Sequence, residues 1–119
     1  FHKINTYRLG QVAYLLDRLK NTMDGDGSLL DKTAVVWGSP MGDPNLHNHR
    51  RCPLLLMGKA NGAREGNLHI RAPKGTPMAN AFVSLMQGIG HDASSFGDST
   101  GTLALTHPRG PSAAARNRP

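Results

Sequence analysis

Two short apolar runs, each closed by a glycine, form the clearest pattern in this chain. Residues 33–38 and 53–58 are rich in Val, Leu and Met and are too short for helices, so both are predicted to be buried strands. The segment between them has no helical periodicity. Because loops that leave the ends of buried strands often carry functional side chains, we expect any site of this protein to lie there.

The apolar positions before these strands follow a helical period. Between residues 5 and 23, Leu, Val and Met recur at steps of three and four with charged residues between them, which predicts an amphipathic helix. The acidic, glycine-rich segment 24–28 is expected to end that helix as a turn. It is superficially similar to a calcium loop, but it lacks the closing glutamate of an EF-hand, which favours the plain turn.

Further elements are predicted in the C-terminal half. Residues 67–71 alternate apolar and polar side chains like an edge strand, with His69 pointing outward. Thr76 followed by Pro77 is typical of a helix start. With one more short strand at 102–105, the order of elements indicates an α/β fold, a mostly parallel sheet with flanking helices.

Length and charge narrow the classes of protein. At 119 residues the chain holds one domain at most, and it contains no apolar run long enough to cross a membrane. Its net charge of +6 comes partly from Arg109, Arg116 and Arg118 in the segment 107–119, which is predicted to be a disordered basic tail. The remaining charge is mild and aromatic residues are few, so a nucleic-acid-binding module is not expected.

The loop between the two predicted strands carries the residues that point to chemistry. His47 and His49 are separated by one residue, so on an extended backbone they project from the same side and reach one metal ion. Asp43 adds a carboxylate oxygen, and three ligands with an open position are typical of a catalytic, zinc-like site. The alternative is that both histidines bond the backbone while Asp43 forms a tight turn.

Two arginines and a cysteine follow the histidines. Arg50 and Arg51 are suited to hold the oxygens of an anionic small-molecule substrate, although a solvated strand edge is the alternative for either. Cys52 is the only cysteine, which excludes a disulfide within this chain. It is expected to be a small buried residue at the start of a strand.

Several blocks of the sequence, in one order, resemble a known family. Over residues 2–106 the chain is similar to the C-terminal part of the bacterial domain-of-unknown-function family 1552, which itself resembles the alkaline phosphatase and sulfatase superfamily. The blocks that carry the resemblance are residues 34–43, 47–54, 66–69, 77–80 and 95–101.

The resemblance implies a fold and a metal site. Superfamily members are α/β proteins that hydrolyse phosphate or sulfate esters with bound divalent metals, so residues 1–106 are expected to belong to an alkaline-phosphatase-like domain. His47 and His49 match ligand positions. Pro40 stands where the family has glutamate, so the resemblance implies either that Asp43 substitutes for it or that the site has lost a ligand.

The resemblance also implies what the chain lacks by itself. The nucleophile and the first metal ligands of the superfamily lie in the N-terminal half, and no residue here plays that part. The leading hypothesis is therefore a C-terminal segment of a larger, exported hydrolase, inactive alone, whose partner is the remainder of its own chain. The rival is a non-enzymatic binding or structural domain on the same scaffold.

Overall fold

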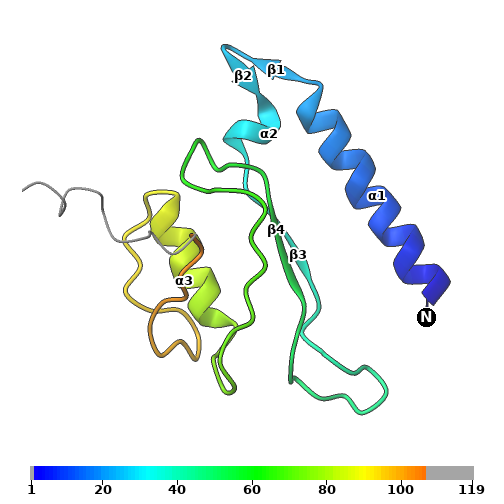
Figure 1. Ribbon diagram of the computed structural model, residues 1–119, viewed down its shortest axis with the longest axis vertical. Coiled ribbons are helices and arrows are strands. Elements are labelled where there is room, and N and C mark those ends of the chain that lie inside the picture. Colours follow the sequence, from blue (N-terminus) through cyan, green and yellow to red (C-terminus); the bar gives the residue numbers. More distant parts are fainter. Residues whose placement is uncertain (1, 107–119) are drawn as a thin grey trace, which may run out of the picture.

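The protein's structure is a computed structural model that describes residues 2–106. Within that range the chain forms three helices and two two-stranded sheets, with α1 and α3 on opposite sides of a central hairpin (Figure 1). In chain order the elements are α1 (His2–Lys20), β1 (Met23–Asp24), β2 (Gly27–Ser28), α2 (Leu29–Lys32), β3 (Val35–Gly38), β4 (Leu54–Met57) and α3 (Ala79–Gly88).

The two predicted central strands form, but they pair antiparallel. Val35 lies opposite Met57 and Gly38 opposite Leu54, and residues 39–53 turn the chain back as the loop of a hairpin. A parallel pair needs a crossover connection, usually a helix, and this loop does not provide one. The predicted fold class, an α/β fold with a mostly parallel sheet as in the C-terminal segment of an alkaline-phosphatase-like fold, is therefore wrong for residues 2–106.

The hairpin is anchored to α2 through backbone hydrogen bonds made after β4. Lys59 N donates to Leu30 O at 3.2 Å, and Ala60 N donates to Thr33 O at 3.1 Å. Gly58 allows this contact, because it has a φ of 83° and a Cβ there would lie 2.1 Å from the Thr33 oxygen. The chain leaving β4 therefore returns to the helix that precedes β3.

A capping box fixes the start of α2. Ser28 Oγ accepts a hydrogen bond from Asp31 N at 3.2 Å, while Asp31 Oδ2 accepts from Ser28 N at 3.2 Å. The other carboxylate oxygen of Asp31 pairs with Lys59 Nζ at 2.8 Å. The Lys59 bond and then the Ser28 bonds lower the pKa of Asp31 from 3.8 to about 2.

The acidic turn before α2 forms a small hairpin and also faces a lysine. Residues 23–24 and 27–28 pair as β1 and β2. Lys32 Nζ lies 3.2 Å from Asp24 Oδ2 and 3.9 Å from Asp26 Oδ1. The two carboxylates are thus partnered by an ammonium group, in keeping with the plain turn that the sequence favoured over a calcium loop.

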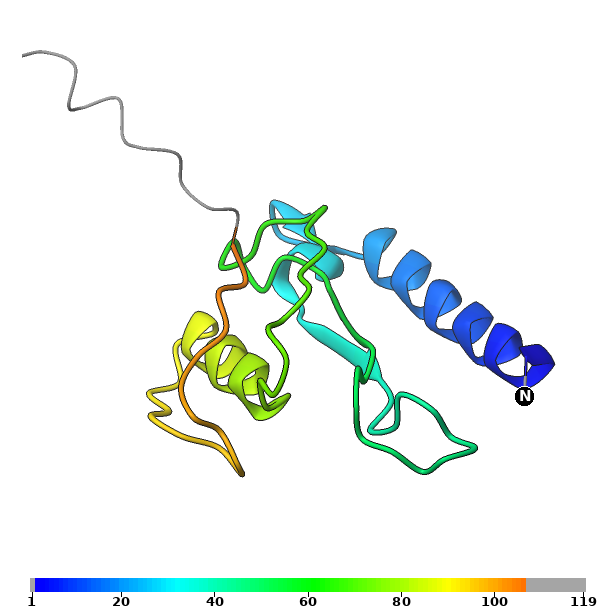
Figure 2. The same cartoon turned by 60° about the horizontal axis from the view of Figure 1, so that its bottom comes forward.

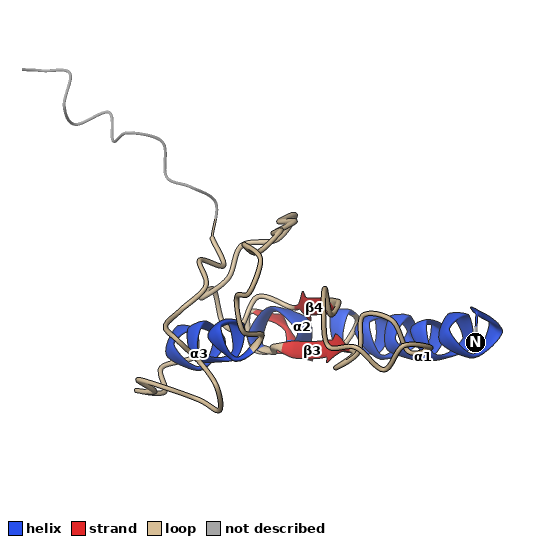
Figure 3. Ribbon diagram, turned by 90° about the horizontal axis from the view of Figure 1, so that it is seen from below, coloured by secondary structure: helices blue, strands red, loops and turns tan. Residues whose placement is uncertain are grey.

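The first helix forms close to the expected place but buries little. It spans His2–Lys20 instead of residues 5–23, and none of its residues is buried. Val12, Leu16 and Leu19 are half-buried, whereas Tyr7 and Tyr14 are 69% and 63% exposed. Figure 3 shows α1 extending away from the rest of the molecule. Its apolar face is therefore largely uncovered within residues 2–106.

The described core gathers around α3. The buried residues are Ala60, Ala79, Asn80, Ala81, Val83 and Ala93, and Val83 is fully buried. The C-terminal segment lies along this helix, in orange beside yellow α3 in Figure 2. Phe82 and Phe96 meet edge to face with ring centroids 5.9 Å apart. The small side chains of α3 let this C-terminal segment, here called the wrapping segment, approach the helix closely.

Polar side chains of α3, and not the backbone of a neighbouring strand, form hydrogen bonds with that segment. Asn80 Oδ1 accepts from Thr100 N at 2.9 Å, and Asn80 Nδ2 donates to Thr100 Oγ1 at 3.2 Å. Ser84 Oγ accepts from Leu103 N at 2.8 Å. The segment is thus bonded to helix side chains, where a strand would be bonded to another strand.

Three smaller predictions also differ from the structure. The strands expected at 67–71 and 102–105 are not present, since neither segment forms a backbone ladder with another part of residues 2–106. The α3 helix begins at Ala79 with Met78 as its N-cap, and no side chain caps it, so the Thr76 cap is wrong. The predicted disordered tail, 107–119, lies outside the described residues.

The β3–β4 hairpin is apolar on both faces. Opposed residues of an antiparallel pair share a face, so Val36 lies with Leu56 on one face and Trp37 with Leu55 on the other. Val36 is 39% exposed and Leu55 is 41% exposed. Each face therefore carries an apolar side chain that residues 2–106 do not bury.

Asn80→Ala is expected to destabilise the protein by about 1–3 kcal/mol, because it removes the buried Asn80 side chain that accepts the part-buried hydrogen bond from the Thr100 backbone N–H. The free energy of unfolding in urea measures this. The matched control is Thr102→Ala at an exposed position, which should change that free energy by less than about 0.5 kcal/mol. Equal effects of the two variants would contradict the bonding described for α3.

Acid should loosen the α2 corner between about pH 4 and about pH 2. The pKa of Asp31 is lowered in the folded protein, so its stabilising effect is present above the ordinary value of 3.8 and is lost as the pH falls towards about 2. NMR titration of the Asp31 carboxyl gives its midpoint. Lys59→Ala should move that midpoint upward, and an unchanged midpoint would show that the ion pair does not form.

Candidate functional site

The loop between β3 and β4 closes through its own backbone. Ser39 N donates to Pro53 O at 3.1 Å next to the strands, and Gly42 N donates to Asn48 O at 3.1 Å further out. Gly42 is packed so closely that a Cβ would lie 1.7 Å from the Arg50 oxygen. The loop is therefore two connected turns, and the inner turn brings residues 40 and 49–52 together.

Two reactive side chains converge on one carbonyl oxygen in that inner turn. His49 Nδ1 lies 2.8 Å from Pro40 O, and Cys52 Sγ donates to the same oxygen at 3.0 Å. Because both atoms contact one oxygen, their separation cannot exceed the sum of the two distances. An imidazole nitrogen, a thiol sulfur and a carbonyl oxygen thus face a common point.

The shared acceptor defines the tautomer of His49. A carbonyl oxygen only accepts hydrogen bonds, so the neutral ring carries its proton on Nδ1 and leaves Nε2 as the lone-pair nitrogen. His49 and Pro40 are both exposed, and Cys52 is half-buried. The inner turn is therefore open to an ion from solvent.

The predicted metal set of His47, His49 and Asp43 is not assembled. His47 has a φ of 49°, so the extended backbone on which the His-x-His spacing depended does not occur. Asp43 Oδ1 accepts from Asn45 N at 2.9 Å and Leu46 N at 3.3 Å, which makes it a turn residue. Among residues 2–106, no three His, Cys, Asp or Glu side chains gather as around one ion.

The two predicted anion-binding arginines are exposed, and two residues that were not predicted as site residues take part in the inner turn. Arg50 and Arg51 are exposed, and Arg51 has a φ of 55°. Proline cannot bind a metal through its side chain, but the Pro40 carbonyl is the atom that His49 and Cys52 share. The His-x-x-Cys spacing from His49 to Cys52 was the sequence signal for this pair, and sequence reasoning had treated Cys52 as a packing residue.

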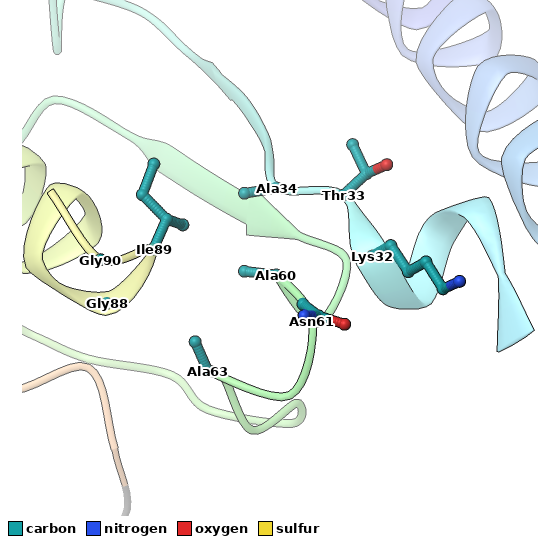
Figure 4. A pocket seen from close by; sticks show the side chains of 9 residues that line it. All are labelled: Lys32, Thr33, Ala34, Ala60, Asn61, Ala63, Gly88, Ile89 and Gly90. Atoms are coloured by element: carbon teal, nitrogen blue, oxygen red, sulfur yellow. The ribbon is translucent and has the colours of Figure 1, made fainter.

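A hollow in the described part of the chain lies away from this loop. It has a volume of about 700 Å³ and lies between the end of α2, the turn after β4 and the end of α3. Figure 4 shows that the Lys32 side chain points away from it. The space is lined mostly by small side chains and backbone, from Thr33, Ala34, Ala60, Asn61, Ala63, Gly88, Ile89 and Gly90. It lacks the convergent polar groups expected of a ligand site.

A second hollow and the side chain of Arg64 are two further features of the described structure. The hollow, of about 400 Å³, is lined by residues 67–71 with Ala104 and Thr106 and contains His69. Burial lowers the pKa of Arg64, and its Nε and Nη1 are buried without a hydrogen-bond partner within residues 2–106. A buried hydrogen-bond donor without an acceptor lowers the stability of the folded protein, and the described residues provide no acceptor for these two Arg64 nitrogens.

Known proteins do not assign the site. No protein-family model, curated protein or solved structure matches this chain. The resemblance to the family of unknown function therefore stays a prediction. No helix within residues 2–106 is long and apolar enough to span a membrane.

The tautomer of His49 is directly testable. At neutral pH, ¹⁵N NMR of the ring should report mainly the Nδ1–H form, because the Pro40 carbonyl accepts that proton. For exposed His47 and His69 we expect the Nε2–H form that free histidine favours in water. If all three rings gave the same tautomer ratio, the inner turn would not be organised as described.

Proposed function

We propose that the β3–β4 loop binds a divalent transition-metal ion of the zinc type through His49 Nδ1 and Cys52 Sγ. The observation that carries the proposal is the convergence of these two atoms on Pro40 O, at 2.8 and 3.0 Å. Zinc bonds are about 2.1 Å to imidazole nitrogen and about 2.3 Å to thiolate sulfur. Small side-chain rotations therefore bring both atoms within reach of one ion.

The chemistry of the donors selects the class of metal. Imidazole and thiolate are the ligands that zinc-like ions prefer, whereas Mg²⁺ and Ca²⁺ take oxygen ligands. Binding moves the imidazole proton from Nδ1 to Nε2 by exchange with solvent and releases the thiol proton. The site therefore gives up one proton net, and its affinity falls as the pH is lowered.

The geometry of the loop supports metal binding and does not by itself indicate a catalysed reaction. Ser39, the hydroxyl that follows β3, donates to Met41 O at 2.9 Å and accepts from Met41 N at 3.2 Å, so it is held within its own turn. Arg50 and Arg51 stay proposed contacts for an anion beside the ion. Hydrolysis of phosphate or sulfate esters and export of the protein stay predictions that rest on the family resemblance.

A second candidate is a structural segment that packs against further protein. It is favoured by the hairpin, which is apolar on both faces with Val36 and Leu55 each about two-fifths exposed. The Arg64 donors that have no partner within residues 2–106 support the same candidate, because a carboxylate from another segment would accept their hydrogen bonds. The proposed partner is the remainder of a longer chain that contains this sequence.

Cobalt binding tests the metal proposal. Adding Co²⁺ to the full chain in a non-thiol reductant should give thiolate charge-transfer absorption, and Zn²⁺ should displace it. Cys52→Ser keeps a donor for the Pro40 carbonyl but removes the soft ligand. It should weaken binding by at least about 100-fold, because loss of even an outer-shell partner costs about 10- to 100-fold at metal sites.

Three histidine variants separate this site from the one that the sequence predicted. His49→Ala should weaken Co²⁺ binding as strongly as Cys52→Ser, whereas His47→Ala and His69→Ala should leave it unchanged. A loss of binding with His47→Ala would favour the predicted His-x-His pair. Absence of a thiolate band with the unmodified chain would refute the proposal.

A further inference from the structure

We propose that two copies of this chain share one metal ion, each contributing His49 and Cys52. This inference rests on the metal binding proposed above and names the partner that completes the site. Its basis is the donor count, because within residues 2–106 no third His, Cys, Asp or Glu side chain gathers with this pair. A structural zinc site normally has four protein ligands in a tetrahedron.

The charge balance favours two equal pairs. Two thiolates and two neutral imidazoles carry a total charge of −2, which cancels the charge of a divalent ion. A single loop would leave the ion with a net charge of +1 between exposed Arg50 and Arg51. In the shared site the ion and its four ligands together carry no net charge, and they are the ligand set of a common structural zinc site.

The position of the loop allows a second copy to reach it. It projects from the end of the hairpin that lies away from α2 and α3 (Figures 1 and 2). Leu46, in the same loop, is 68% exposed, so it adds apolar surface near the proposed contact. A two-fold axis through the ion makes the contact isologous, with the same loop on both sides.

The arginines make the association depend on the metal. Arg50 and Arg51 are both exposed in the loop, so bringing two loops together places four cationic groups close to one another. Metal coordination has to outweigh this repulsion. The chain is accordingly expected to remain monomeric when a chelator is present, and higher salt is expected to favour the metal-bound dimer.

The test measures stoichiometry and mass in the same titration of the full chain. With Zn²⁺ in a non-thiol reductant, one ion should bind per two chains, and the mass from light scattering should double and return on adding a chelator. With Co²⁺, the charge-transfer absorption per ion should be about twice that of a single Co²⁺–thiolate bond. On ion binding, the ¹⁵N signal of His49 should change from the Nδ1–H to the Nε2–H form.

The outcomes separate this inference from the proposal on which it rests. One ion per chain with an unchanged mass, together with a thiolate band, would leave metal binding intact and overturn the shared site. A mass that is already doubled in the reductant without metal, or that stays doubled after a chelator is added, would show that the chains associate by another contact and would also overturn it. No thiolate band would remove both, and Cys52→Ser is expected to stay monomeric with Zn²⁺.

Discussion

The antiparallel return of the chain from β3 to β4 determines where everything else lies. Once Leu54–Met57 pairs back along Val35–Gly38, the residues after β4 lie beside α2, and their backbone N–H groups donate to carbonyl oxygens at the end of that helix. Gly58 makes that approach sterically possible. Because the anchor uses backbone groups, it depends on chain direction more than on particular side chains.

The same return of the chain also shapes the loop that carries the candidate site. A crossover connection would have spread residues 39–53 over a sheet face, whereas the hairpin folds them onto themselves. Pro40 and Cys52 lie near the two ends of that segment, so closing the hairpin brings them within hydrogen-bond distance across twelve positions of sequence. His49 lies beside them because the residues between Pro40 and His49 fold into the outer turn, which Asp43 holds through its hydrogen bonds.

Stability is distributed unevenly in the described structure. Apart from Val83, the buried apolar residues are alanines, so the core around α3 removes little apolar surface from water. Side-chain hydrogen bonds from Asn80 and Ser84 hold the wrapping segment there. By contrast, α1 and both hairpin faces leave large apolar residues exposed, which is the physical reason to expect that this chain associates with further protein.

The sequence by itself determined the local elements and the region of interest. Helical periodicity predicted α1, short apolar runs closed by glycine predicted β3 and β4, and the density of polar groups singled out the loop between them. These are local properties, because period and composition fix how one segment buries its side chains. The acidic, glycine-rich segment 24–28, predicted to be a turn, lies in the β1–β2 hairpin.

Tertiary structure alone decided the direction of the central pair and the identity of the candidate ligands. Apolar runs in parallel and antiparallel strands look alike, so the sequence pattern did not distinguish them. The His-x-His prediction assumed an extended backbone, and the left-handed conformation of His47 removed that condition. The pairing of His49 with Cys52 depends on a carbonyl nine and twelve residues away, and side-chain patterns carry no information about where a backbone oxygen will lie.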